Sequence, residues 1–400
     1  MKTHSSVIAA AVVGSMGFGG AGFAQNAPKP VPIDPSSVAS PVVSPDRHVT
    51  FRLLAPDVSA VQVLSWDIPG LGDGAMTKEP DGVWDATVGP IPPGGYRYLF
   101  QTSGVKLTDP RNPNVSQSND YPWSFVYVPG SNLMDTRMVP HGAVATVTYY
   151  STALSMFRHM HVYTPPGYTA GNDKYPVLYL LHGSGDSDDS WVTVGRAGFI
   201  LDNLIADKKA KPMIVVMPLG HIHQSGQAGP RRRTSNTEPD EFVDDFVTDI
   251  MPYIEKNYRT VNDRDHRAVA GLSMGGLQTL DIGIPHLDKF AYMGVFSAGV
   301  FGIAGPIYPG GPDLRPKTPG QLTDWETLNH AGLDNPKLKS GLKLLWFRVG
   351  SDDWLKPTAQ ATVDMLQRHG FHPEFSESAG GHIWANWREY LGIFAPRLFR

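Results

Sequence analysis

The chain has 400 residues, with 38 acidic and 34 basic side chains, a net charge of −4 and no cysteine. A hydrophobic fraction of 41% is enough to bury a core, which excludes global disorder. The mildly negative balance and the lack of a long basic run argue against nucleic acid as a partner. Disulfides, thiolate nucleophiles and cysteine-ligated metals are excluded. The length predicts two or three domains.

The N-terminus predicts export. Met1–His4 is weakly basic, an uncharged apolar stretch runs from Val7 to Phe23, and small residues precede Gln25. This pattern is typical of a signal peptide, residues 1–24, cleaved near Ala24. The alternative is a membrane anchor, but the stretch is short for a span of about 20 residues. Export of a cysteine-free chain favours the bacterial periplasm or medium, with no membrane association after cleavage.

Residues 25–44 are rich in proline, serine and alanine and predict a linker. Residues 45–130 contain short β-prone runs separated by Gly, Pro and Asp turns, which predict a small all-β, immunoglobulin-like sandwich. Its tryptophans, Trp66, Trp84 and Trp123, belong either to the core or to a sugar-binding surface. The runs are Val49–Leu54, Ala60–Trp66, Val83–Val88, Gly95–Gln101 and Trp123–Val128.

From about residue 138 to residue 400, strands and helices alternate, which predicts an α/β fold with a mostly parallel sheet flanked by helices. Uninterrupted apolar runs indicate strands covered on both faces. Helical spacing appears from Gly198 to Lys208 and from Phe242 to Met251, the second helix with Thr237 as its cap. The strand-forming runs are Val177–Leu181, Met213–Met217, Ala268–Gly271, Ala291–Phe296 and Leu342–Val349.

A candidate nucleophile follows the strand at Ala268–Ala270. The run Gly271-Leu272-Ser273-Met274-Gly275 matches G-x-S-x-G between a strand and a helix, the context that the motif requires. The turn lifts the Ser273 hydroxyl above the sheet at a helix N-terminus. There the Met274 amide can stabilise an oxyanion.

A serine nucleophile needs a base and an orienting acid, which follow in the order Ser, acid, His in an α/β hydrolase. Two candidate acids, Asp352 and Asp353, end the strand near Val349, and Asp353 is favoured because a turn's length separates it from the strand. His382 is the predicted base, since it follows Gly380-Gly381 in an irregular loop after the last strand.

The loop after the strand Val177–Leu181 is the expected source of a second oxyanion donor. It reads His182-Gly183-Ser184-Gly185, and its glycines allow backbone amides to point toward Ser273. We expect the Ser184 amide to donate, Gly183 to shape the turn and His182 to be structural.

With these residues placed, the chain resembles the esterase-D-like enzymes of carbohydrate esterase family 1, which holds bacterial feruloyl esterases and some acetyl-xylan esterases. The resemblance implies an α/β-hydrolase fold with Ser273, Asp353 and His382 as the catalytic triad and no cofactor. It departs from the family where Trp354 replaces a common Phe after the acid. The upstream sandwich resembles an early-set or family-48 carbohydrate-binding module. The matching motifs are Val139–Gly142, Arg158–Tyr168, Tyr175–Gly183, Ser190-Trp191, Lys211–Pro218, Gly271–Gly276 and Gly381–Arg388.

Other side chains suggest the surroundings of the site. Trp191, Trp354 and Trp384 flank the candidate loops and are expected to wall a pocket for an aromatic acyl group. His221 and His223 lack further ligands at metal spacing, so no metal is expected. Arg231–Arg233 forms either a solvated loop or a loop that covers an acidic ligand.

These features predict a serine carboxylesterase that removes feruloyl or acetyl groups from plant polysaccharide such as xylan. The alternatives are a siderophore esterase of the enterochelin-esterase type and a non-catalytic carbohydrate-binding protein. The expected partner is a polysaccharide or a small ester, and nothing in the sequence indicates an oligomeric state. Because every predicted catalytic residue follows residue 138, we expect residues 139–400 alone to hydrolyse small esters.

Overall fold

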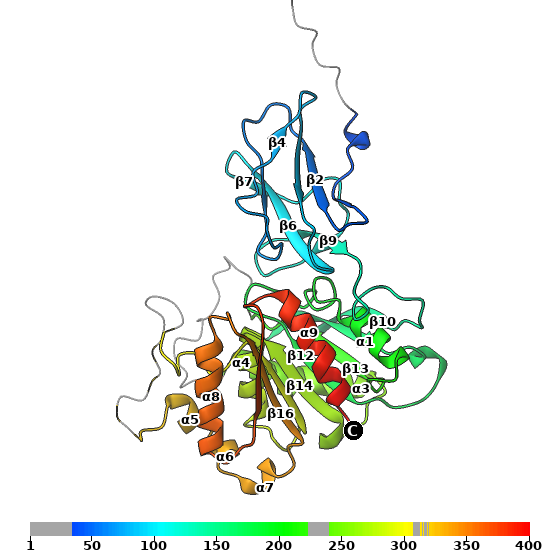
Figure 1. Ribbon diagram of the computed structural model, residues 1–400. Coiled ribbons are helices and arrows are strands. Elements are labelled where there is room, and N and C mark those ends of the chain that lie inside the picture. Colours follow the sequence, from blue (N-terminus) through cyan, green and yellow to red (C-terminus); the bar gives the residue numbers. More distant parts are fainter. Residues whose placement is uncertain (1–33, 223–239, 307–312, 314, 316–317, 319) are drawn as a thin grey trace, which may run out of the picture.

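The computed structural model describes residues 34–222, 240–306, 313, 315, 318 and 320–400 (Figure 1). The predicted signal peptide, residues 25–33 of the predicted linker, and His223, Arg231–Arg233 and Thr237 lie outside these residues. The described chain forms an all-β part and an α/β part, which lie end to end (Figure 1). We call them the β domain and the hydrolase domain. Among the described residues, none of the helices is long and apolar enough to cross a membrane.

The β domain contains two sheets with strand orders β1-β2-β5-β4 and β3-β6-β9-β8, and β7 pairs with β6. Their inward side chains share one core, which includes Phe51, Val63 and Tyr98. Val42 and Val43, placed in the predicted linker, pair with β2 as strand β1. The strands are β1 (Val42–Val43), β2 (Val49–Leu54), β3 (Gln62–Leu64), β4 (Thr77–Lys78), β5 (Val83–Val88), β6 (Gly94–Thr102), β7 (Val105–Leu107), β8 (Val115–Ser116) and β9 (Trp123–Val128).

The hydrolase domain is built on an eight-stranded sheet of order β10-β11-β13-β12-β14-β15-β16-β17. β10, β11 and β13 pair in antiparallel fashion, and all pairs from β13 onward are parallel. The antiparallel edge hairpin and β17 were not predicted. The strands are β10 (Ala143–Ser151), β11 (Met156–Thr164), β12 (Val177–Leu181), β13 (Ile214–Pro218), β14 (Arg267–Leu272), β15 (Tyr292–Phe296), β16 (Leu344–Gly350) and β17 (Glu374–Ser378).

Helices cover both faces of this sheet (Figure 1). α1 and α9 pack on one face, whereas α2, α3, α4 and α8 pack on the other. Asp240, rather than the predicted Thr237, caps α2 by accepting a hydrogen bond from the Phe242 amide. The helices are α1 (Ala197–Ala206), α2 (Glu241–Asp245), a π-helical segment (Phe246–Ile250), α3 (Met251–Asn257), α4 (Met274–Gly283), α5 (Asp324–Leu328), α6 (His330–Leu333), α7 (Pro336–Lys339), α8 (Lys356–Arg368) and α9 (Trp384–Phe394). Short 3-10 turns lie at Pro35–Ser37, Tyr168–Ala170, Arg264–His266 and Ala395–Arg397.

The central strands have uniformly apolar sequences because side chains on both of their faces are buried. In β12, Val177 and Tyr179 face one core while Leu178 and Leu180 face the other. Both faces of the sheet are therefore buried, as expected for parallel strands between two helical layers.

A buried arginine joins the two domains. The Arg388 side chain, on α9 of the hydrolase domain, donates from Nη1 to the carbonyl of Gly95 in β6 at 3.1 Å and to that of Val194 at 2.9 Å. Burial lowers the pKa of Arg388. A buried guanidinium that bonds to both domains indicates a fixed interface rather than a flexible tether.

Candidate active site

Ser273 stands on a strained turn between β14 and α4. Its backbone has φ 53° and ψ −119°, a conformation that L-residues rarely adopt. The flanking glycines are required by close packing: a Cβ on Gly271 would lie 2.3 Å from the Gly275 carbonyl oxygen, and a Cβ on Gly275 would lie 2.6 Å from the His182 carbonyl oxygen. The turn therefore presents the serine at the carboxyl edge of the sheet, as the motif predicts.

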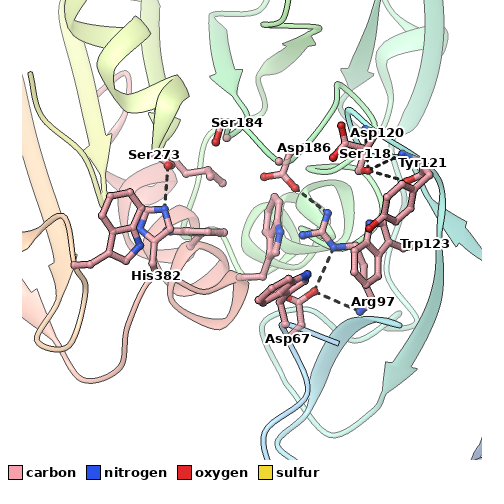
Figure 2. A pocket seen from close by; sticks show the side chains of 17 residues that line it. Asp67, Arg97, Ser118, Asp120, Tyr121, Trp123, Ser184, Asp186, Ser273 and His382 are labelled. Atoms are coloured by element: carbon pink, nitrogen blue, oxygen red, sulfur yellow. Dashed lines mark hydrogen bonds and ion pairs between the residues drawn. The ribbon is translucent and has the colours of Figure 1, made fainter. Parts of the chain in front are cut away.

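A continuous hydrogen-bond chain links Ser273 to His382 and Asp353. His382 Nε2 lies 2.9 Å from Ser273 Oγ, and His382 Nδ1 lies 3.0 Å from each Asp353 carboxylate oxygen (Figure 2 shows the Ser273–His382 bond). The Asp353 side chain is fully buried and also accepts the Leu355 amide at 2.9 Å. Asp352, the competing acid, is exposed and makes no contact with His382 among the described bonds. The geometry thus joins the three residues that the sequence singled out.

Two backbone amides belong to residues close to Ser273: Met274 follows it in the chain, and Ser184 lines the same cleft. Met274 is the first residue of α4, so its amide has no intrahelical acceptor. The Ser184 amide has no partner within the described part of the chain. Gly183 packs closely against Ser273 and Leu272. A Cβ on Gly183 would lie 3.4 Å from Ser273 Cβ and 2.7 Å from Leu272 Cδ1. Met274 and Ser184 are therefore available to bind an oxygen anion.

The buried ring of His182 and the half-buried ring of His221 lie side by side, with centroids 5.3 Å apart. His182 Nε2 accepts the Gly220 amide at 2.9 Å, so Nδ1 must donate to the Gly183 carbonyl at 2.8 Å, and the ring is neutral. Burial lowers the pKa of His182 and lowers that of His221 to about 4. The described residues contain no cluster of three metal-ligating side chains. Two hydrogen bonds therefore fix the orientation of the His182 ring.

Ser273 opens into a cleft of about 370 Å³ that lies between the two domains. Figure 2 shows the side chains of the hydrolase domain facing those of the β domain across it. Residues from the β domain that line it are Trp66, Asp67, Arg97, Ser118, Asp120, Tyr121 and Trp123. Those from the hydrolase domain are Gly183, Ser184, Gly185, Asp186, Leu272, Ser273, Trp354, His382, Trp384 and Trp387.

The tryptophans that the sequence assigned to a pocket divide into two groups. Trp354 and Trp384 line the cleft, and Trp354 stacks obliquely on His382 with ring centroids 5.0 Å apart. Trp191 does not line the cleft: it is buried, donates from Nε1 to the Leu181 carbonyl at 3.0 Å and packs edge-on against Trp384. The prediction for Trp191 as a pocket residue was therefore wrong, and this ring supports the wall from behind.

The tryptophans of the β domain also differ from one another. Trp84 belongs to the core and donates to the Ala55 carbonyl. Trp66 is 85% exposed at the rim of the cleft. Trp123 is 8% exposed, lines the cleft and stacks on Tyr121 with ring centroids 5.6 Å apart. The aromatic surface on this side is therefore made by Trp66, Tyr121 and Trp123.

The charged groups of the cleft were not found from the sequence, because no motif connects them. Arg97 lies between Asp67 and Asp186 and bonds to both. Burial opposes its charge, yet the two carboxylates outweigh burial and raise the pKa of Arg97. With Asp120, the cleft holds three carboxylates against one guanidinium. These side chains come from separate parts of the β domain and from the 182–190 loop, and they meet only in the folded chain.

The strand order, and the place of Ser273 between β14 and α4, define an α/β hydrolase. Within this class the chain belongs to the esterase family, whose family model, described as "Putative esterase", matches residues 151–393.

Relatives span either one or both domains. An endo-1,4-beta-xylanase/feruloyl esterase of Xylanibacter ruminicola is 31% identical over 381 residues, which are 93% of this chain and 47% of that protein. The chain thus spans about half the length of this relative. A solved ferulic acid esterase is 28% identical, with a TM-score of 0.52, and covers 64% of this chain and 98% of its own. The enterobactin esterase of Shigella flexneri, solved in the presence of enterobactin, shares the fold over 88% of this chain and 92% of its own, at 17% identity and a TM-score of 0.58.

Proposed function

We propose that this protein is a serine carboxylesterase that removes feruloyl groups from plant cell-wall polysaccharide such as xylan, with acetyl as the smaller alternative acyl group. The observation that carries this proposal is the Ser273–His382–Asp353 hydrogen-bond chain, which opens on an aromatic cleft. The similarity to the Xylanibacter ruminicola protein extends over both domains and supports the substrate class.

In the proposed first half-reaction, Ser273 Oγ attacks the ester carbonyl carbon and transfers its proton to His382 Nε2. The charge on the carbonyl oxygen is stabilised by the Met274 and Ser184 amides, with Gly183 shaping the turn. Asp353 holds the imidazole in the required tautomer and stabilises the imidazolium. Collapse of the tetrahedral intermediate breaks the bond to the sugar oxygen, which takes the proton from His382. The acyl group remains on Ser273.

In the second half-reaction, His382 takes a proton from water, and the hydroxide formed attacks the acyl carbon. The same two amides stabilise the second tetrahedral intermediate. The bond to Ser273 Oγ then breaks, the serine regains its proton from His382, and the free carboxylic acid leaves. The sequence consumes one water for each ester, and no metal or cofactor is needed for its balance.

The shape of the cleft favours an ester with a planar acyl group and a sugar alcohol. Trp354 is 55% exposed beside His382, where its ring can flank a phenolic acyl group, whereas the Trp384 ring lines the cleft but is almost fully buried. Trp66 and Tyr121 lie on the opposite, more exposed side. We assign this outer side to the polysaccharide, because exposed aromatic faces suit the apolar faces of sugars.

We further infer that residues 45–130 form an immunoglobulin-like, family-48-type carbohydrate-binding module and that residues 138–400 form the esterase domain. Cleavage of a signal peptide near Ala24 would deliver the enzyme to the periplasm or medium. A polymeric substrate outside the cell is consistent with that destination.

A siderophore esterase is the second candidate, favoured by the fold shared with the enterobactin esterase over most of the chain. The charge of the cleft argues against it. A ferric catecholate is anionic, whereas the only guanidinium among the described lining residues is already paired with Asp67 and Asp186. Asp120 adds a further negative charge on the same wall.

The test compares three substrates with the full-length mature enzyme: methyl ferulate, acetylated xylan and ferric enterobactin. We expect the highest kcat/KM for methyl ferulate and negligible hydrolysis of ferric enterobactin. The Ser273→Ala variant is the control for contaminating esterases. Preference for ferric enterobactin would replace the proposed function with the second candidate, and no hydrolysis of any ester would indicate a non-catalytic binding protein.

A further inference from the structure

The 182–190 loop, which carries the Ser184 amide, contains three aspartates with separate anchors. Asp188 accepts from Nδ1 of His159 and of His161, both on β11, at 2.8 Å each. Asp186 and Asp189 instead contact the β domain. Two of the three anchors of this loop therefore come from outside the hydrolase domain.

The contact of Asp186 is an ion pair with Arg97 on β6. Arg97 Nη1 donates to Asp186 Oδ1 at 2.8 Å, and Arg97 Nε donates to Asp67 Oδ2 at 3.2 Å (Figure 2). All three side chains are largely buried, with 13% exposure for Arg97, 8% for Asp67 and 6% for Asp186. Paired charges with so little access to water hold their geometry much more firmly than surface pairs.

Asp186 is directly coupled to the turn that presents Ser184. Its amide donates to the Gly183 carbonyl at 3.1 Å, which closes a turn with Ser184 inside it. A Cβ on Gly183 would lie 3.1 Å from Asp186 Oδ2, so the carboxylate also packs against the start of the turn. A shift of the Asp186 side chain would therefore shift the Ser184 amide.

The contact of Asp189 holds the far end of the same loop. The Gln117 amide, between β8 and β9, donates to Asp189 Oδ2 at 2.8 Å, and Ser116 Oγ lies 2.7 Å from Thr193 Oγ1. The β domain thus bonds to the 182–190 loop at Asp186 and at Asp189. The turn that contains Ser184 lies next to Asp186.

We propose that Arg97 of the β domain is a positioning residue of the esterase: through Asp186 it holds the Ser184 amide where the oxyanion forms. This inference rests on the proposed function and adds to it that the β domain is part of the catalytic apparatus. Arg97 also balances the Asp186 carboxylate, which lines the cleft with Ser184 and Ser273. A bare carboxylate at that place would oppose the negative charge of the transition state.

The experiment measures kcat and KM of the full-length Arg97→Met variant, with active sites counted by stoichiometric labelling of Ser273 with a fluorophosphonate. We expect kcat per labelled site to fall about 10- to 100-fold, since displacing a catalytic group by about 1 Å can cost about 10²-fold. KM should change less. Arg97→Lys should recover part of kcat, because an ammonium can still pair with Asp186 but cannot bridge two carboxylates.

A matched control is Arg52→Met, on β2 of the same domain, whose guanidinium hydrogen-bonds only to the Ala39 carbonyl among the described groups. This variant should keep the wild-type kcat. An Arg97→Met enzyme that loses active sites but keeps kcat per site would show a merely structural role. A rise in KM at constant kcat would show a substrate contact. Either result would overturn the proposal.

Asp186→Asn tests the same contact from its other end, also in the event that Arg97→Met does not fold. It should lower kcat, and the double variant Arg97→Met/Asp186→Asn should be no slower than Arg97→Met alone, because the two residues act through one contact. Multiplicative losses would contradict the inference. Repeating the series with 4-nitrophenyl acetate separates the test of Arg97 from the choice of substrate. Activity toward this ester without activity toward methyl ferulate would refute the feruloyl proposal and leave the Arg97 test intact.

Discussion

The two walls of the cleft are built in different ways. On the hydrolase side, Ser273 and His382 are held by a strained turn and by hydrogen bonds that end on the buried carboxylate of Asp353. On the β-domain side, Trp66 and Tyr121 present exposed rings. Hydrogen bonds fix the positions of the side chains on the hydrolase side, as a reaction that makes and breaks bonds requires. The β-domain side instead offers an aromatic surface for binding. Arg97 is the exception, because it belongs to the binding wall and bonds to the catalytic one.

The largest expected loss of activity comes from a substitution on the hydrolase side of the cleft. Replacing Ser273 with Ala removes the proposed nucleophile but no core contact, so we expect a loss of roughly 10⁶-fold in kcat with an unchanged fold. Ester hydrolysis together with the thermal unfolding midpoint checks both parts. A variant that keeps about a tenth of the wild-type rate would place the nucleophile elsewhere.

The two neighbouring aspartates give the next largest difference. Asp353→Asn should lower kcat by about 10⁴-fold, because an amide cannot orient and stabilise the imidazolium of His382. The matched variant Asp352→Asn, at an exposed position, should change kcat by less than about threefold. Parallel steady-state kinetics decide the assignment, and the opposite ranking would transfer the acid role to Asp352.

Substitutions of single tryptophans test whether the two sides of the cleft bind different parts of the substrate. Trp66→Ala should raise KM about tenfold, or ~1.4 kcal/mol, for a feruloylated xylo-oligosaccharide and leave methyl ferulate unaffected. Trp354→Ala should raise KM for both substrates, because this ring lies beside His382. Equal effects of Trp66→Ala on both substrates would mean that the acyl group, and not the sugar, occupies the outer wall.

The last prediction concerns the pH dependence of protein stability, rather than catalysis, and the histidine next to the 182–190 loop. The folded-state pKa of His221 is lowered from 6.5 to about 4, so below pH 6.5 the unfolded chain binds a proton that the folded chain does not. Stability should therefore fall as the pH drops from 6.5 toward 4, by up to about 3 kcal/mol from this group.

Urea unfolding at pH 6.5 and 5 checks this prediction. His221→Asn keeps a hydrogen-bond donor without titrating in this range, so its stability should depend less on pH than that of the wild type. His330→Asn, at an exposed position, serves as the control and should behave like the wild type. If both variants show the wild-type pH dependence, the acid sensitivity has another source.

The sequence was informative where local rules determine structure. The G-x-S-x-G turn, the apolar runs of β12 and β14 and the order Ser273, Asp353, His382 all follow from patterns within short windows. The edge strands β10 and β17, and β11 next to β10, were missed because their solvent-facing residues break the apolar run, as the burial of β17 shows.

The rest of the site depends on contacts between distant segments. Arg97, Asp67 and Asp186 carry no motif, and they meet only because the β domain docks on the 182–190 loop. Trp191 was misassigned for a related reason: its position next to a catalytic loop did not reveal that the ring points into the core. The expectation that residues 139–400 alone hydrolyse small esters stays a prediction, and the proposed role of Arg97 implies a lower kcat for that fragment, because removing the β domain would leave Asp186 without Arg97.

The central claim, a feruloyl-transferring serine in a cleft between two domains, is tested most directly by trapping the acyl-enzyme. Methyl ferulate is added to the full-length enzyme, the reaction is quenched in acid within the first turnover, and the peptide that contains Ser273 is analysed by mass spectrometry. The account predicts a feruloyl group on Ser273 in the wild type and none in Ser273→Ala. Hydrolysis of methyl ferulate without acylation of Ser273, or acylation of another residue, would contradict it.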